Sequence, residues 1–255
     1  MRAVRTAIAT HPIPAYIAIA FVFSWTFTAL VSVSVAFGLI ALFGPAVAAF
    51  AVSWADGTLA EMRGRTTNWR QPLRTYGVAL GLPFAVAATG AVVFALAGTP
   101  WTGFGSISAI EGVIFVLVIG EEIGWRGFLQ PRLRTRMGLL ESGLVVGVVW
   151  TLWHAPMYLG EGLIAFLTFA WWVVPLAVVM GFVVERARYS VIVATVMHGA
   201  ANIATPILLP GIDRTAWLLV TGAIYALVAA GLVIRDRRRA VETTALIVVT
   251  RSSAA

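Results

Sequence analysis

The stretch VLVIGEEIGWRGFLQPRLRTR, residues 116–136, starts as an apolar helix and then carries two acids and a base, Glu121, Glu122 and Arg126. An arginine-rich end at 132–136 follows about ten residues after Glu121, and at about 1.5 Å per residue this places Glu121 roughly 15 Å inside the apolar layer. On insertion scales a charge at such a depth costs about 2.5–3.5 kcal/mol. These side chains are therefore expected to face a bundle interior or a water-filled cavity.

The chain around this stretch is too apolar to be solvated by water. Of its 255 residues, 60% are hydrophobic and 11% are charged, whereas a soluble domain usually carries about 25% charged residues. A lipid bilayer is therefore the expected solvent. The absence of cysteine excludes disulfides and a thiol nucleophile. The net charge of +7 comes from arginines in short clusters between apolar segments. This distribution is typical of membrane topology, so we expect no nucleic-acid partner.

We predict an all-α fold, a polytopic transmembrane helical bundle of about eight spans. Arginine-rich and arginine-poor loops alternate along the chain, so the positive-inside rule places the arginine-rich loops and both termini in the cytoplasm. We expect one transmembrane domain, residues 1–239, followed by a short cytoplasmic tail, residues 240–255. The first apolar run is longer than a signal-peptide core and is interpreted as a retained span. The predicted spans lie near residues 13–33, 35–55, 76–97, 107–130, 139–159, 163–184, 190–209 and 215–234.

Within the fourth predicted span, Glu122 and Arg126 are four residues apart on one helical face and can form an ion pair. Glu121 points about 100° away from Glu122 and lacks this cationic partner, which leaves its carboxyl group available to accept and donate protons. A plainer interpretation is that the cluster only holds helices together, and the pattern EExxxR by itself does not exclude it.

Two other predicted spans also carry polar side chains inside apolar sequence. His154 lies in VVWTLWHAPMYL, just before Pro156, whose ring is expected to kink the helix and open space beside the histidine. His198 and Asn202 lie four residues apart in VATVMHGAANIATP and share a face. Each could be a hydrogen-bonding contact between helices. The convergence of an acid, bases and an amide on three helices favours a catalytic site instead.

The motifs EEIGWR, WTLWH and HGAAN, in this order, resemble those of the CAAX protease and bacteriocin-processing family, also called the Abi family of intramembrane proteases. The family signature is EExxxR, then an aromatic residue four before a histidine, then HxxxN, each on its own helix. The resemblance covers about residues 115–209, within a motif-bearing core of about 107–209. Trp150 stands where the family commonly has phenylalanine, a difference expected to change packing more than chemistry.

The resemblance implies a protease-like helical membrane domain whose active site is reached from the cytoplasm. It implies that Glu121 and His154 activate water to attack a peptide carbonyl. It further implies that His198 and Asn202 stabilise the oxyanion, while Glu122 and Arg126 support the first motif helix. This distribution of roles meets the needs of peptide hydrolysis, which requires an activated nucleophile, a proton donor and donors to the developing oxyanion.

A metal-dependent mechanism is the alternative within the same class. Glu121, His154 and His198 could supply three ligands to zinc and leave a position open for water. The chain has no HExxH motif, so all three ligands would come from separate segments. We therefore favour a mechanism without a metal cofactor.

Two other functions remain open on the sequence. A non-catalytic membrane regulator or immunity protein of the same family would act through protein contacts, and the intact polar set argues against it. A proton-coupled transporter also uses buried Glu and His, but the chain shows no internal repeat. For a protease, the expected partners are the bilayer and a membrane-embedded or lipid-modified peptide or protein. The expected location is a multi-pass position in a prokaryotic plasma membrane.

Overall fold

The computed structural model describes the backbone of residues 2–252 and the side chains of residues 5–238. Every regular element in this range is a helix, so the predicted all-α class is confirmed. The elements are α1 Arg2–Thr10, α2 Pro12–Thr28, α3 Val35–Ala41, α4 Gly44–Asp56, α5 Leu59–Thr66, α6 Leu73–Leu96, α7 Ala109–Leu117, α8 Ile119–Gly124, the π-helix η1 Trp125–Leu129, α9 Gln130–Arg134, α10 Leu139–Trp153, α11 Ala155–Leu159, α12 Leu163–Arg186, α13 Val191–Leu208 and α14 Arg214–Ser252.

Five helical segments in the described range are long and apolar enough to cross a membrane, which makes the chain an integral membrane protein. Two shorter apolar helices, α2 and α10, accompany them. The structure does not fix the number of spans, so the count of eight and the cytoplasmic position of both termini stay predictions. The five long segments are Val35–Asp56, Leu73–Leu96, Leu163–Arg186, Val191–Leu208 and Arg214–Arg238.

The span expected at 107–130 is not one continuous helix. It begins at Ala109 as α7, bends at Val118, continues as α8 and then widens into η1. The backbone of α8 lies very close to a neighbouring segment where the helix changes form. A Cβ added at Gly120 would lie 2.8 Å from the carbonyl oxygen of Leu42. π-helical turns inside helices are frequent at functional sites.

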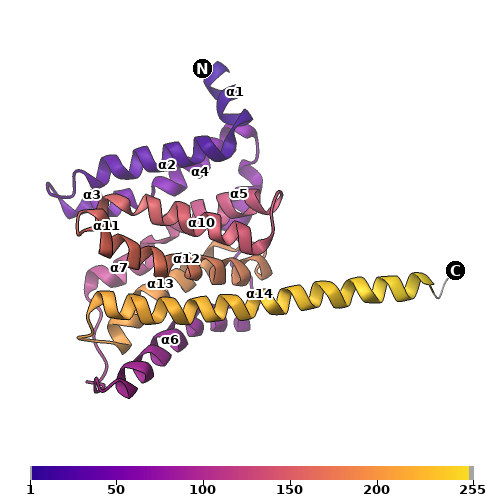
Figure 1. The fold of residues 1–255 in the computed structure, drawn as a ribbon. Helices are drawn as coiled ribbons and strands as arrows, with labels where there is room; N and C mark the ends of the chain where they lie inside the picture. The colour runs from indigo at the N-terminus through magenta and orange to yellow at the C-terminus, as the bar shows by residue number, and fades with distance from the viewer. Residues whose placement is uncertain (1, 253–255) are drawn as a thin grey trace.

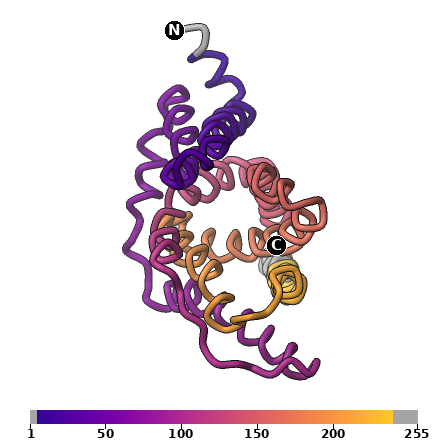
Figure 2. Tube along the Cα trace, turned by 90° about the vertical axis from the view of Figure 1, so that its left-hand side faces the viewer, coloured from indigo at the N-terminus to yellow at the C-terminus, as the bar shows by residue number. Residues whose placement is uncertain are grey.

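The bundle surrounds α12 and α13, the most deeply buried of the long segments. α12 packs between α10 and α14, and α13 packs against α6 and α7. Figure 1 shows these helices running side by side, with α2 and α4 paired at the N-terminal side. Seen along the bundle in Figure 2, the N-terminal helices and α14 lie on opposite sides of this core.

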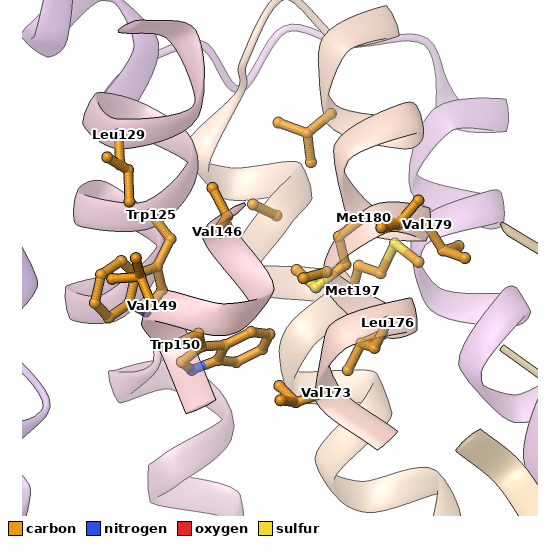
Figure 3. Close-up of a cluster of buried hydrophobic side chains, with 14 of the residues drawn as sticks. Trp125, Leu129, Val146, Val149, Trp150, Val173, Leu176, Val179, Met180 and Met197 are labelled. Carbon is orange, nitrogen blue, oxygen red and sulfur yellow. The ribbon is translucent and has the colours of Figure 1, made fainter. Parts of the chain in front are cut away.

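Glycine allows α10 and α12 to approach closely. A Cβ on Gly143 would meet the Cα of Val178 at 2.9 Å, and one on Gly147 would meet the Cα of Val174 at 2.8 Å. Small residues spaced four apart are a common means of packing membrane helices. The adjoining core joins α10, α12, α13 and the η1 region (Figure 3) and includes Trp125, Leu129, Val146, Val149, Trp150, Val173, Leu176, Val179, Met180 and Met197.

α14 continues well beyond the bundle to Ser252 (Figure 1), so most of the segment 240–255 is helical. Residues 253–255 lie outside the described residues. The division into a domain of residues 1–239 and a cytoplasmic tail of residues 240–255 stays a prediction.

Candidate active site

Glu122 joins two of the predicted site helices through its carboxylate. Arg126 donates from Nη1 to both carboxylate oxygens, at 2.8 and 3.1 Å. His198 Nδ1 lies 2.8 Å from Oε1 of the same carboxylate. The expected pairing of Glu122 with Arg126 is confirmed, while the hydrogen bond to His198 was not predicted. Glu122 and Arg126 are fully buried, so the pair lies where losing one partner is costly.

The guanidinium of Arg126 is further held by packing. It lies over the indole of Trp150, with 4.5 Å from Cζ to the ring centroid, which is within the range of a cation–π contact. Nη2 lies 3.3 Å from the sulfur of Met180 on α12. Nε has no hydrogen-bond partner among the described residues. Arg126 therefore ties η1 to α10 and α12 as well as to Glu122.

Glu121 lies in a separate environment without an arginine. Its Oε2 accepts hydrogen bonds from the indole N–H of Trp150 at 2.8 Å and from that of Trp125 at 3.4 Å. The residue is 2% exposed. Both donors are neutral, so they orient the carboxyl group without forming an ion pair with it. The expected division between a paired Glu122 and a Glu121 without a cationic partner is present in the structure.

His154 caps the C-terminal end of α10, and Pro156 lies in the first turn of the short helix that follows. Its Nδ1 lies 3.0 Å from the carbonyl oxygen of Trp150. Because a carbonyl can only accept, Nδ1 carries the proton and a neutral ring has its lone pair on Nε2. The ring packs between Trp153 and Phe169, with centroids 4.7 Å away in each case. These contacts restrict the ring orientation.

Trp150 contacts more of the candidate site residues than the sequence indicated. Its N–H binds Glu121, its ring contacts Arg126 and the edge of His198, and its carbonyl accepts from His154. Phenylalanine at this position would offer no N–H to Glu121, so the expectation that tryptophan here changes packing more than chemistry stays a prediction. The available signal was chemical: a buried indole N–H usually finds a hydrogen-bond acceptor.

Asn202 is the predicted site residue that the structure does not connect to the others. It lies one turn after His198 on α13 and is half-buried. Within the described part of the chain, no hydrogen bond joins its amide to another residue. It shares a helix face with His198, as the spacing predicted, and its role stays a prediction.

A small cavity of about 80 Å³ adjoins His154. It lies between the α2–α3 region and the α10–α11 corner, and Thr28, Gly38 and Met157 are among its lining residues. The proline-associated break therefore leaves space beside the histidine, as expected. The cavity lies at the end of α10 opposite the arginine-rich loop. Entry of a substrate from the cytoplasm stays a prediction.

The three residues considered as zinc ligands in the alternative mechanism are not assembled into a metal site in the described part of the chain. Among the described side chains, no group of three His, Cys, Asp or Glu residues is placed to hold a metal ion. His154 and His198 each use Nδ1 in a hydrogen bond, which is also how zinc-bound histidines are oriented. Glu121, however, offers Oε2 to two indole N–H groups. The residues as arranged do not fit a three-ligand zinc ion.

Comparison with known proteins found two similarities. Residues 101–204 match the model of a family described as type II CAAX prenyl endopeptidase Rce1-like. This segment includes Glu121, His154, His198 and Asn202. The matched segment is therefore similar to this family of proteases. The chain is also similar to CAAX prenyl protease 2 of the archaeon Methanococcus maripaludis, with 26% identity over 149 residues, 53% of this chain and 54% of that protein. The chain thus spans about half the length of this curated relative.

Proposed function

We propose that this chain is an intramembrane endopeptidase that cleaves a peptide bond of a membrane-associated protein or peptide. One observation carries the proposal: the buried carboxyl group of Glu121 is oriented by two neutral N–H donors, in a family-matched segment whose histidines face the same tryptophan. A carboxyl group held in this way is positioned for proton transfer and is not tied into an ion pair.

In the proposed reaction, Glu121 and His154 together activate one water molecule. A proton passes from the water to Glu121, while Nε2 of His154 accepts a hydrogen bond from the same water and orients it. The water oxygen forms a bond to the carbonyl carbon, and the carbonyl electrons move to its oxygen. When the C–N bond breaks, the proton held by Glu121 passes to the leaving nitrogen.

The developing oxyanion is stabilised by His198 and Asn202. Asn202 donates from its side-chain amide. His198 already uses Nδ1 toward Glu122, so it donates from Nε2 when both ring nitrogens carry protons. The Glu122–Arg126 pair has a supporting role. It orients His198 and holds α8 and η1, which carry the EEIGWR motif.

The proposed substrate is a peptide that reaches the site from the bilayer or its surface. The curated relative is named a CAAX prenyl protease, so a C-terminal peptide with a prenylated cysteine is the first substrate to assay. The archaeal relative also supports our placement of the chain in a prokaryotic plasma membrane.

The direct test uses purified chain in liposomes with a quenched fluorescent peptide, prenylated and unprenylated. The parent should cleave at least one of them. Glu121→Gln should nearly abolish turnover because the carboxyl group no longer accepts a proton. Glu141→Gln, which changes an exposed carboxyl group at the start of α10, should leave turnover unchanged. A parent without cleavage activity, or a Glu121→Gln variant as active as the parent, contradicts the proposal and favours a regulatory role.

A further inference from the structure

A groove of about 400 Å³ lies between α6, α12 and α14, away from the candidate active site. One arginine from each helix lines it: Arg74, Arg186 and Arg235. Arg74 lies in the first turn of α6, Arg186 is the last residue of α12, and Arg235 lies beyond the apolar part of α14. All three therefore gather at the arginine-rich end of the bundle, where the apolar layer meets water.

The same groove is apolar one turn deeper on each helix. Val78 follows Arg74 by four residues on α6, and Phe182 precedes Arg186 by four on α12. On α14, Leu232 precedes Arg235 by three. Residues three or four apart share a helix face, so each helix presents a cation at the interface and an apolar side chain on the membrane side of it.

Most of this positive charge is not neutralised within the protein. Arg74 and Arg235 are exposed and have no ion pair or hydrogen bond in the described part of the chain. Arg186 donates to the carbonyl of Phe182 at 2.7 Å and lies 3.7 Å from Asp236, so one acid accompanies three arginines. Thr75, in the first turn of α6, also lines the groove, and the positive end of this helix dipole points toward it.

We propose that this groove binds an anionic phospholipid. The phosphate-bearing headgroup lies among the three arginines, and one acyl chain lies along the deeper apolar wall. Basic pockets between membrane helices are suited to anionic headgroups, and the apolar wall selects an amphiphile over a free anion. A larger groove of about 550 Å³ between α10, α12 and α14 is wholly apolar and has no group that would select an occupant. This proposal does not depend on the peptidase activity.

Native mass spectrometry of the purified chain in detergent tests the proposal. Phosphatidylglycerol and phosphatidylcholine with identical acyl chains are added in equal amounts, and inorganic phosphate is added in separate samples. The parent should retain phosphatidylglycerol with a preference of about 100-fold, since each of the three arginines near an anionic lipid contributes about fivefold. Millimolar inorganic phosphate should not displace the lipid.

The decisive variant is Arg74→Gln combined with Arg235→Gln, which should remove about 10- to 30-fold of the preference. Its matched control is Arg63→Gln combined with Arg237→Gln, two exposed arginines outside the groove, which should keep the preference. Thermal unfolding in the same detergent verifies that both variants fold. Equal retention of the two lipids by the parent, an unchanged preference in the decisive variant, or displacement by inorganic phosphate would each overturn the assignment.

Discussion

At the residue scale, Trp150 links the parts of the site that come from different helices. It lies on α10, where its N–H donates to the carboxyl group of Glu121 and its ring lies near the rings of both histidines. It also lies beneath the guanidinium of Arg126. A single indole therefore supplies a donor, an aromatic face and a backbone acceptor, and its N–H group can be removed without removing the ring.

Trp150→Phe is expected to lower kcat by about 10- to 100-fold, with a small effect on KM. A hydrogen bond to a charged or ionisable group contributes about 1.5–3 kcal/mol, and here that bond orients the carboxyl group that we propose transfers the proton. Steady-state cleavage of a fluorogenic peptide measures both constants. Trp125→Phe is the comparison, because its bond to Glu121 is longer, 3.4 Å against 2.8 Å. A larger loss for Trp125→Phe than for Trp150→Phe would show that the indole of Trp150 does not position the acid.

Arg126→Ala is expected to destabilise the fold as well as abolish activity. It leaves Glu122 buried without its cationic partner, and breaking a buried pair costs about 3–5 kcal/mol. Arg214→Ala breaks an exposed pair with Glu161 and should cost at most about 1 kcal/mol. Unfolding of both variants in detergent gives the comparison. An Arg126→Ala protein as stable as the parent but inactive would instead assign Arg126 a direct role with the substrate.

At the scale of helices, the contact between α10 and α12 fixes the height of Trp150 in the site. Gly147 lies three residues before Trp150 and presses against the backbone of Val174. The broken helix from α7 through η1 likewise sets the position of Glu121 and Glu122 in the site. The site is thus positioned by backbone contacts at glycines and by a π-helical turn.

Gly147→Ala is expected to destabilise the protein by about 1–3 kcal/mol through overpacking. The added Cβ would lie 2.8 Å from the Cα of Val174, so α10 must shift. Turnover should fall by up to about 100-fold, because a shift of about 1 Å at a catalytic group has effects of that size. Gly81→Ala, in α6 with open space around it, should be neutral or slightly stabilising. Equal melting temperatures and turnover for the two variants would refute this view of the α10–α12 contact.

The helices were predictable where apolar length alone defines them, as in α6, α12 and α13. The break inside 107–130 was not, because periodicity does not reveal where a neighbouring backbone will approach a glycine such as Gly120. Pairing of Glu122 with Arg126 followed from their spacing on one helix. The bond between Glu122 and His198 joins helices distant in sequence, and no local pattern encodes which residue will meet which.

At the scale of the whole molecule, the fold class was predicted from the composition and the membrane orientation from the distribution of arginines. A chain with 60% hydrophobic residues has to bury its polar groups inside a helical bundle when it lies in lipid. The fold class follows directly, and the few buried acids and histidines become candidates for a functional site. The orientation in the membrane depends on the arginine-rich loops alone.

Cysteine labelling in intact cells tests this orientation, since the chain contains no native cysteine. Single cysteines at the exposed positions Thr67 and Thr135 should resist a membrane-impermeant maleimide. One at Ser106, exposed in the connection after α6, should react. Labelling of Thr135 from outside would invert the topology and also place the lipid groove in the other leaflet.

The central claim, water activation by Glu121 and His154 without a metal, is tested most directly by measuring zinc content and peptide cleavage on the same purified samples. Parent, Glu121→Gln, His154→Ala, His198→Ala and Asn202→Ala are compared before and after exhaustive chelation. The expected result is cleavage by the chelated parent, no stoichiometric zinc, near-complete loss in the Glu121 and His154 variants, and a loss of about 10²–10³ in kcat for Asn202→Ala. One zinc per chain, lost with activity in the Glu and His variants and restored to the chelated parent by added zinc, would contradict it.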